Sequence, residues 1–328
     1  MCSSDLTRIL CGRVGSPFTF ATFRAERLLA PGQLTYKQMR EMYRYDQIGP
    51  ETEVYGVIAD PVAHSLSPCV HNAGFSALGL NKVYVPFRVA REDLPSFLSN
   101  CREFGIKGLS VTIPHKENVM RYLSQMDPVC KEIEAVNTID FSGPTAVGAN
   151  TDYLAIQQVL DDAMGKPDKQ KPLEGITALV LGAGGVAKAA AFALDSLGAR
   201  CVISSRTDAR SEQLANHCNG QAVPWEERHD VKCDLVVNGT PVGMHPNVNE
   251  TPFDGKHLRG SMFVFDTVYN PEQTLFVKQA REAGCQAITG IDMFVRQAAL
   301  QFKTFTAKDA PLPQMREALV RAIGPARS

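Results

Sequence analysis

The chain of 328 residues is long enough for two domains, and a hydrophobic content of 44% supports a full core in each of them. A net charge of -1 argues against nucleic acid or an anionic membrane as the main partner. No apolar run approaches the roughly 20 residues that a membrane span requires.

The nine cysteines indicate a protein that keeps its thiols reduced. No two of them form a C-x-x-C pair, and no spacing of cysteine and histidine suits zinc, so we expect no metal site. Several lie within apolar runs, as buried thiols do. These features favour the cytoplasm.

Strand and helix patterns alternate through the first half of the chain. Residues 1–52 are mixed and partly charged, and the alternation begins at residue 53. The expected strands are 54–58, 84–89, 108–113 and 135–139, and the expected helices are 68–78 and 92–104. The polar stretch at 165–175 then predicts a surface loop between domains.

The same alternation continues to the end of the chain. Strands are expected at 176–181, 200–204, 235–238, 263–266 and 287–289, and helices at 274–283, 292–304 and 313–323. Alternation on this scale predicts an α/β protein with parallel sheets, and for the second half a doubly wound nucleotide-binding fold.

A glycine turn follows the strand at 176–181. The dinucleotide fingerprint G-x-G-x-x-G/A is matched by Gly182, Ala183, Gly184, Gly185, Val186 and Ala187. Gly182 allows the tight turn, Gly184 lets the backbone approach a pyrophosphate, and Ala187 keeps helix and strand close. The N–H groups at the helix start would point at the anion. A strand-to-helix turn without a ligand is the alternative.

The residues after the next strand indicate which dinucleotide binds. Where an NAD site places an acid for the ribose 2'-hydroxyl, this chain has Ser205, Arg206 and Thr207, with Arg210 close behind. Cations here suit a 2'-phosphate, which predicts NADP as the cofactor. The alternative is that both arginines are ordinary solvated residues at a helix start.

Polar side chains also mark strand ends in the first half. Ser65 and Ser67 precede a helix opened by Pro68, where hydroxyls and helix N–H groups can receive a carboxylate. Helix capping is the alternative for both serines.

Three later segments add an ammonium, an amide and a carboxylate. Thr112 and Lys116 follow one strand, Asn137 ends another, and Asp152 follows in the segment Asn-Thr-Asp. Because α/β sheets assemble ligand sites at strand ends, these groups predict a second binding surface.

With the tail from Gly290 to Ala298, these motifs resemble shikimate dehydrogenases over about residues 53–328. The resemblance implies a substrate domain of residues 53–152 and 289–328, with a Rossmann-like NADP-binding domain inserted at 153–288. It implies NADPH-dependent, reversible reduction of 3-dehydroshikimate to shikimate, a step of chorismate and aromatic amino acid biosynthesis, by a monomer or homodimer.

The resemblance also implies residue roles. Lys116 and Asp152 match the catalytic pair that flanks the reacting oxygen. The matching substrate-binding residues are Ser65, Ser67 and Tyr269 at the carboxylate, and Thr112, Asn137 and Gln297 at the ring hydroxyls.

Elementary chemistry agrees with the catalytic pair. A hydride that reaches a carbonyl carbon leaves negative charge on the oxygen, which the ammonium of Lys116 can stabilise and protonate. Asp152 would orient the lysine. The alternatives are a surface lysine at a helix start and an aspartate that caps a helix.

Other polar residues beside the motifs receive simpler interpretations. The spacings of His64, His71 and His115 do not suit a metal, so we expect supporting or surface groups. Gln297 would be a buried amide without a hydrogen-bond partner unless a ligand binds to it.

Residues 7–46 resemble the C-terminal end of a type I 3-dehydroquinate dehydratase, which plant-type enzymes fuse to shikimate dehydrogenase. Tyr153, where glycine is frequent, also resembles the plant type. Arg8 and Gln33 fall on substrate positions of the dehydratase, but its Schiff-base lysine and histidine have no match, so dehydratase activity is not expected. Some forty residues cannot close an eight-stranded barrel, so we expect residues 1–52 to be a weakly packed, truncated remnant.

Two alternative functions remain at this stage. An NAD-using quinate/shikimate dehydrogenase is disfavoured by Ser67, where quinate users tend to carry threonine, and by the missing acid near Arg206. A non-catalytic NADP-binding sensor is disfavoured by Lys116 and Asp152.

Overall fold

The computed structural model describes residues 4–27, 29–30, 33–63, 65–165 and 171–324. His64 and residues 166–170 of the expected loop lie outside these ranges. The chain forms two compact units. The first contains Met1–Asp127, Val136–Ala149 and Ala298–Ser328, and the second contains Pro128–Ala135 and Asn150–Gln297.

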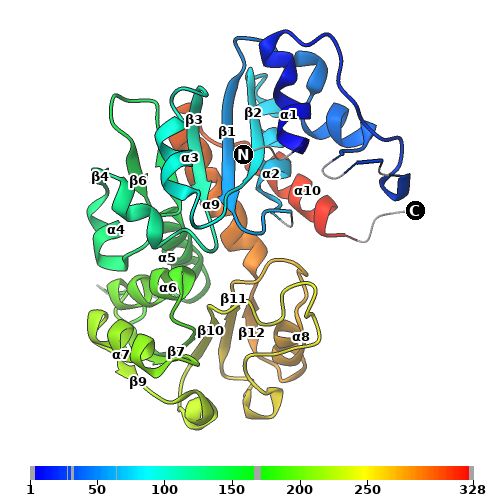
Figure 1. Cartoon of the computed structure of the whole chain (residues 1–328). Coiled ribbons are helices and arrows are strands. Elements are labelled where there is room, and N and C mark those ends of the chain that lie inside the picture. Colours follow the sequence, from blue (N-terminus) through cyan, green and yellow to red (C-terminus); the bar gives the residue numbers. More distant parts are fainter. Residues whose placement is uncertain (1–3, 28, 31–32, 64, 166–170, 325–328) are drawn as a thin grey trace. The chain divides into compact units, whose positions relative to one another are not determined.

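A six-stranded sheet of order β2-β1-β3-β5-β6-β4 forms the centre of the first unit. Its strands are β1 (Glu53–Ala59), β2 (Lys82–Arg88), β3 (Ile106–Val111), β4 (Gln125–Met126), β5 (Thr138–Asp140) and β6 (Val147–Ala149). Six of the seven β1 residues are buried, as expected for a central strand covered on both faces. Figure 1 shows β1 and β2 side by side, and these strands pair in parallel.

Helices α2 (Ser67–Ala77), α3 (Leu94–Asn100) and α10 (Leu312–Ile323) complete the first unit together with the end of α9 (Gly290–Thr306). α2 packs against α10 and against β1 and β2. Gly74 allows α2 and α9 to lie close together, because a Cβ at this position would lie only 2.7 Å from the ring of Phe302 on α9. A segment near the C-terminus therefore helps to form the core of this unit.

The expectation of a parallel sheet is wrong for one strand of this sheet. β5 pairs antiparallel with both β3 and β6. The reason is chain length: the few residues between β5 and β6 allow a hairpin, whereas parallel neighbours need a long crossover.

Two expected elements of the first unit are clearly shorter in the structure. The strand expected at 135–139 is β5 at Thr138–Asp140, because the main chain before it bonds outside the sheet: the N–H of Val136 donates to the carbonyl of Lys116. The helix expected at 92–104 is the shorter α3, and the turns after it end at Gly105, whose φ of 68° a helix does not adopt.

The second unit has the doubly wound fold expected from the sequence. Its sheet has the order β12-β11-β10-β7-β8-β9, and every neighbouring pair is parallel. Read from the other edge, this is the strand order 3-2-1-4-5-6 of dinucleotide-binding domains. The strands are β7 (Thr177–Leu181), β8 (Arg200–Ser204), β9 (Gln221–Ala222), β10 (Leu235–Asn238), β11 (Phe263–Asp266) and β12 (Gln286–Ile288).

Helices cover this second sheet. They are α4 (Pro128–Ile133), α5 (Thr151–Met164), α6 (Gly185–Ser196), α7 (Asp208–His217) and α8 (Leu275–Glu282). α4 and α5 both pack on α6, and α8 packs on β11 and β12. On one side, buried Leu179, Val236 and Phe276 belong to a single apolar cluster.

The compact units and the expected domains divide the chain at different residues. α4 belongs to the second unit because it packs on α6, and α5 begins at Thr151 in that unit. At the other end the division falls between Gln297 and Ala298, inside the continuous helix α9.

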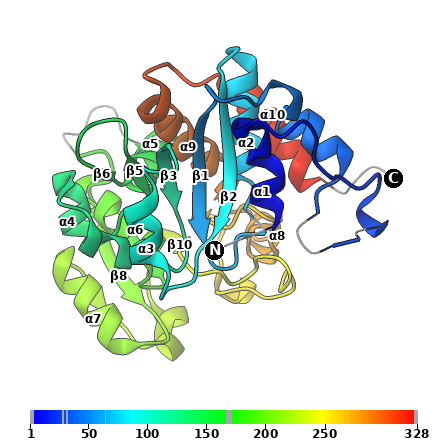
Figure 2. The same ribbon diagram turned by 45° about the horizontal axis from the view of Figure 1, so that its top comes forward.

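The N-terminal segment is partly packed. α1 (Ser4–Leu10) contacts β2 and lies beside it in Figure 2, and Ile9, Met39 and Tyr43 are buried. The expected weak packing is therefore wrong for these parts. It holds for the middle of the segment, where six large apolar side chains are 55–90% exposed: Val14, Phe18, Phe20, Phe23, Leu29 and Tyr36.

Short helical turns lie at Cys11–Val14, Ala25–Arg27, Gln38–Met42, Tyr45–Gln47, Asn118–Tyr122, Trp225–Asp230 and Gly255–His257.

Candidate active site

The first sheet brings two predicted site residues to one edge. β1 and β3 are parallel and end together, and the N–H of Thr112 donates to the carbonyl of Ile58 at 3.1 Å. β5 is antiparallel to β3, so its first residues lie where β3 ends. The N–H of Val111 donates to the carbonyl of Asn137 at 2.7 Å. Thr112 and Asn137 are thus neighbours across two strands.

Lys116 joins them through the turn that follows β3. The N–H of His115 donates to the Thr112 carbonyl at 2.8 Å, which closes the turn, and the N–H of Val136 donates to the Lys116 carbonyl at 2.9 Å. Lys116 is half-buried. The predicted hydroxyl, ammonium and amide therefore lie on adjoining segments of the first unit.

Neither serine is the N-cap residue of α2. Leu66 occupies the N-cap of α2 without a side-chain hydrogen bond, and Pro68 lies in the first turn, as expected. The Ser65 hydroxyl accepts from the N–H of Ser67 at 3.4 Å, and Ser67 is buried. Its hydroxyl bonds to the phenol of Tyr84, and this bond lowers the Tyr84 pKa while burial raises it more strongly. The capping alternative is therefore wrong for Ser67, whereas the Ser65 hydroxyl does accept from the first N–H of α2.

The two described histidines beside these motifs are buried, so a surface position is wrong for them. The ring of His71 stacks on Tyr84 with centroids 4.3 Å apart, and burial lowers the His71 pKa to about 3. The Nε2 atom of His115 lies 2.8 Å from the Val89 carbonyl, and burial lowers the His115 pKa. Across the described residues, no three histidine, cysteine or acidic side chains are grouped to hold a metal ion.

Asp152 lies in the first turn of α5, in the second unit. It is 4% exposed. The N-cap of this helix is Asn150, whose side chain accepts from the N–H of Tyr153 at 3.1 Å and donates to the Ala135 carbonyl at 2.9 Å. The interpretation of Asp152 as the cap is therefore wrong, and its burial needs another explanation.

Tyr269 and Gln297, also in the second unit, meet at Phe294. The Tyr269 and Phe294 rings have centroids 4.3 Å apart. The Gln297 amide is buried and donates to the Phe294 carbonyl at 3.0 Å. Gln297 is thus not the unsatisfied misfit that the sequence suggested, because its own helix supplies a partner.

The fingerprint turn lies between β7 and α6, where the strand order of the second sheet reverses. Gly182 has a φ of 106°, which only glycine adopts readily, and its N–H donates to the Ser204 carbonyl at 2.8 Å. Gly184 is the N-cap of α6, and a Cβ built on it would meet nothing within 4 Å. A ligand can therefore approach the first N–H groups of a 12-residue helix without a clash.

Sequence reasoning missed the neighbouring segment Asn238-Gly239-Thr240, which begins at the last residue of β10. A Cβ on Gly239 would lie 2.8 Å from the Cβ of Ala187 and 3.1 Å from the Leu181 carbonyl. The Asn238 amide oxygen holds this turn by accepting from the N–H and hydroxyl of Thr240 at 3.0 and 2.7 Å. The available signal was a polar residue and a glycine directly after a buried strand.

The predicted 2'-phosphate residues lie at the end of β8, next to β7. Ser205 is buried, and its hydroxyl shapes the turn through the Thr207 carbonyl at 3.0 Å and Ser211 at 2.8 Å. Thr207 is the N-cap residue of α7, and Arg206 and Arg210 are exposed. This position and charge suit an anion.

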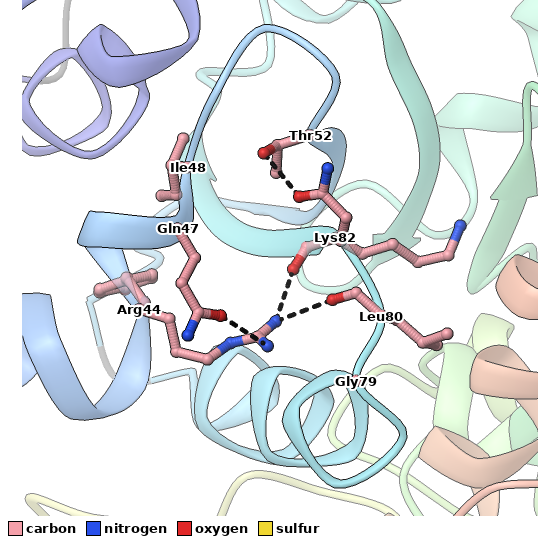
Figure 3. A pocket seen from close by; sticks show the side chains of 9 residues that line it. Arg44, Gln47, Ile48, Thr52, Gly79, Leu80 and Lys82 are labelled. Atoms are coloured by element: carbon pink, nitrogen blue, oxygen red, sulfur yellow. Dashed lines mark hydrogen bonds between the residues drawn. The ribbon is translucent and has the colours of Figure 1, made fainter.

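A cavity of about 270 Å³ in the first unit is remote in sequence from these motifs. Figure 3 shows the Arg44 guanidinium reaching the carbonyls of Leu80 and Lys82, both at 3.1 Å. Tyr43, Arg44, Gln47, Ile48, Thr52, Gly79, Leu80, Asn81 and Lys82 line the cavity. None of them is a predicted site residue, and the arginine joins the N-terminal segment to the end of the α2–β2 loop.

Models of three protein families match parts of the chain. They are the shikimate dehydrogenase substrate binding domain at residues 57–139, the shikimate 5'-dehydrogenase C-terminal domain at 290–320, and type I 3-dehydroquinase at 5–50.

Individual proteins are similar over most of the chain. A shikimate dehydrogenase (NADP(+)) from Moorella thermoacetica is 39% identical over 289 residues, which are 85% of this chain and 96% of that protein. The chloroplastic bifunctional 3-dehydroquinate dehydratase/shikimate dehydrogenase of Arabidopsis thaliana is 39% identical over 93% of this chain, which spans about half (52%) of that protein. The crystal structure of shikimate 5-dehydrogenase from Thermus thermophilus with NADP(H) and shikimate has a TM-score of 0.74 and 32% identity, over 82% of this chain and 99% of that one.

Proposed function

Because the chain belongs to the shikimate dehydrogenase family, we propose that it catalyses the NADPH-dependent, reversible reduction of 3-dehydroshikimate to shikimate. The observation that carries the proposal is the meeting of Thr112, Lys116 and Asn137 at one sheet edge, in a chain whose second unit has the dinucleotide-binding strand order. The enzyme is thus an NADP-dependent oxidoreductase acting on a CH–OH group.

Lys116 is the proposed acid and base of the reaction. NADPH, when bound, supplies the hydride for the carbonyl carbon. The Lys116 ammonium stabilises the charge that develops on the carbonyl oxygen and donates a proton to it, and the reverse reaction uses the neutral amine. Asp152 is proposed to orient that ammonium, which would explain a carboxylate that is buried and yet does not cap α5.

The remaining substrate contacts follow from the chemistry of shikimate, which has one carboxylate and three hydroxyls on its ring. We assign Ser65 and Ser67 to the carboxylate because hydroxyls at a helix start suit an anion, and we assign the Tyr269 phenol to it as a further hydrogen-bond donor. We assign Thr112, Asn137 and Gln297 to the ring hydroxyls, because these groups can both donate and accept.

NADP is proposed to bind along the edge of the second sheet where the strand order reverses. Its pyrophosphate would lie on the N–H groups from Gly182 to Val186, including those of Ala183, Gly184 and Gly185, and its 2'-phosphate by Ser205, Arg206, Thr207 and Arg210. The open space beside Gly184 and the exposed arginines fit this group.

The domain assignment is also a proposal. We assign residues 53–152 and 289–328 to substrate binding and catalysis and 153–288 to NADP binding, and we relate residues 1–52 to the end of a type I 3-dehydroquinase. The exposed apolar side chains from Val14 to Tyr36 support this relation, because a complete barrel would cover such a surface.

Oligomeric state and compartment complete the proposal. We propose a monomer or homodimer, and we propose the cytoplasm as its compartment because the described residues include eight cysteines and no disulfide. Among those residues, no helix has the length and apolar character to cross a bilayer. The Arabidopsis relative is named as chloroplastic, so imaging of the tagged protein in its own cells is the test, and a plastid signal would overturn the cytoplasm.

Purified protein tests the function directly. We expect NADP reduction with shikimate, weaker turnover with NAD or quinate, and a fall of roughly two to four orders of magnitude in kcat for Lys116→Ala. Lys107→Ala, an exposed lysine on β3, is the matched control and should retain wild-type turnover. Wild-type kcat in Lys116→Ala would refute the assigned role. NADP binding without turnover of any substrate would favour the sensor, and preference for NAD and quinate would favour the quinate-using alternative.

A further inference from the structure

Five buried side chains of the first unit form one continuous line of hydrogen bonds. The Tyr84 hydroxyl donates to Ser110 at 2.5 Å, and Ser110 donates to the Gln301 amide oxygen at 2.7 Å. The Gln301 amide nitrogen donates to the Thr138 hydroxyl at 2.9 Å, and Thr138 donates to the amide oxygen of Asn137 at 2.8 Å. All five are at most 5% exposed. We call this line the Tyr84–Asn137 relay.

The chemistry of the groups fixes the direction of the relay. The Gln301 amide oxygen only accepts, so the single hydroxyl hydrogen of Ser110 must point at it, and Ser110 must accept from Tyr84. The Gln301 nitrogen only donates, so Thr138 accepts there and sends its own hydrogen to Asn137. The Asn137 amide oxygen is therefore held on the Thr138 side, and its nitrogen faces away from Thr138.

Both ends of the relay are firmly held. The Asn72 side chain brackets the Tyr84 main chain with bonds of 2.8 and 2.9 Å, and His71 stacks on the Tyr84 ring. At the other end Gln301 also donates to the main-chain carbonyl of Asn137 at 3.0 Å. Ser67, a proposed carboxylate contact, bonds to the Tyr84 phenol. The relay thus joins two proposed parts of the substrate site through residues that have no assigned role.

We propose that Tyr84, Ser110, Gln301 and Thr138 are positioning residues that present Asn137 to the substrate as a hydrogen-bond donor. This inference rests on the proposed function. An asparagine side chain can turn over and exchange its oxygen and nitrogen, which would place an acceptor where the substrate oxygen needs a donor. With Thr138 donating to the amide oxygen, that exchange would bring two donors together and leave a buried group unpaired, which costs free energy.

A pair of substitutions at Thr138 separates positioning from packing. Thr138→Val keeps the volume and the branched shape but removes the hydroxyl, whereas Thr138→Ser keeps the hydroxyl and loses a methyl group. If the relay positions Asn137, Thr138→Val should lower kcat/KM for shikimate roughly tenfold to a hundredfold, mainly through KM, and Thr138→Ser should lie closer to the wild type. The KM for NADP should change less than about twofold in both variants. A packing role predicts the opposite order, because only serine leaves a cavity.

The outcomes separate this inference from the function on which it rests. A wild-type protein that does not turn over shikimate would overturn both. An active wild type with Thr138→Val equal to or better than Thr138→Ser would overturn the relay alone. Tyr84→Phe is the second variant, because it keeps the ring stacked on His71 and removes only the hydroxyl. It should raise the shikimate KM in the same direction by a smaller factor, and an unchanged shikimate KM in this variant would also overturn the relay.

Discussion

Acid should destabilise the first unit through one buried histidine. His71 is fully buried among the rings of Tyr84, Phe75 and Phe305, and a hydrogen bond with Gln301 raises its pKa by less than burial lowers it. Burial lowers the pKa of His71 from 6.5 to about 3. The substitution His71→Phe keeps an aromatic ring in this aromatic cage and removes the group that titrates.

The sign and size of the effect follow from this pKa. Below pH 6.5 the unfolded chain binds a proton at His71 that the folded chain does not, so folding becomes less favourable as the pH falls. The contribution is fully present above about pH 6.5 and is lost toward pH 3, where the cost reaches about 5 kcal/mol. Between pH 7 and pH 5 the wild type should lose about 2 kcal/mol that His71→Phe does not lose.

Urea denaturation at pH 7 and pH 5, followed by circular dichroism, measures this difference. Each protein is compared with itself, so any constant cost of fitting the larger ring cancels. The single tryptophan, Trp225, lies in the second unit, and its fluorescence reports separately on that unit. His217→Gln, at an exposed site on α7, is the control and should keep the wild-type pH dependence. If His71→Phe lost as much stability as the wild type between the two pH values, the reasoning from burial would be refuted.

Three further predictions concern the second unit. Gly239→Ala should raise the NADP KM and destabilise the fold by about 1–3 kcal/mol, because its Cβ would overlap Ala187. Gly184→Ala should raise the NADP KM with little loss of stability, because a Cβ there meets nothing. Equal melting temperatures for wild type and Gly239→Ala would contradict the packing argument. Arg206→Asp should raise the NADP KM far more than the shikimate KM in steady-state assays, and equal changes would reject the 2'-phosphate contact. Burial raises the pKa of Asp266 to about 6, so its contribution to stability is full below about pH 3.8 and is lost as the pH rises through 6. Between pH 5 and pH 7 the wild type should lose about 1 kcal/mol that Asp266→Asn keeps, as measured by urea denaturation with tryptophan fluorescence, and an identical loss in both proteins would show that Asp266 is not the group responsible.

Local patterns in the sequence were sufficient for the longer strands of the second unit and for its fingerprint turn. β8, β10 and β11 have the expected bounds, and the fingerprint lies between a strand and a helix as predicted. A parallel strand buried on both faces is apolar throughout, and a dinucleotide turn needs glycine at fixed spacing, so both features can be read within a few residues. For the same reason the motifs were enough to predict the family and the cofactor NADP.

The residues at which α5 and β5 begin could be identified only from the structure. Asn150 and Asp152 are both good N-cap residues, and the choice between them depends on where the chain enters α5; the Asn150 side chain also bonds to the carbonyl of Ala135. The strand expected at 135–139 begins later because the N–H of Val136 bonds to the carbonyl of Lys116 and not to a neighbouring strand. The helix and strand propensities of single residues determine neither the N-cap of α5 nor the start of β5.

Contacts between distant parts of the chain lie furthest from what a sequence pattern can predict. Gln301 reaches Ser110 and Thr138 across 191 and 163 residues of chain, and Gly239 approaches Ala187 because neither carries a large side chain. The sequence by itself determined the chemistry available to this protein, because residue types and their local spacing set which groups can donate, accept or carry charge. The tertiary structure alone decided which of these groups meet and which way each hydrogen bond runs, because those outcomes depend on how separate strands and helices pack against each other.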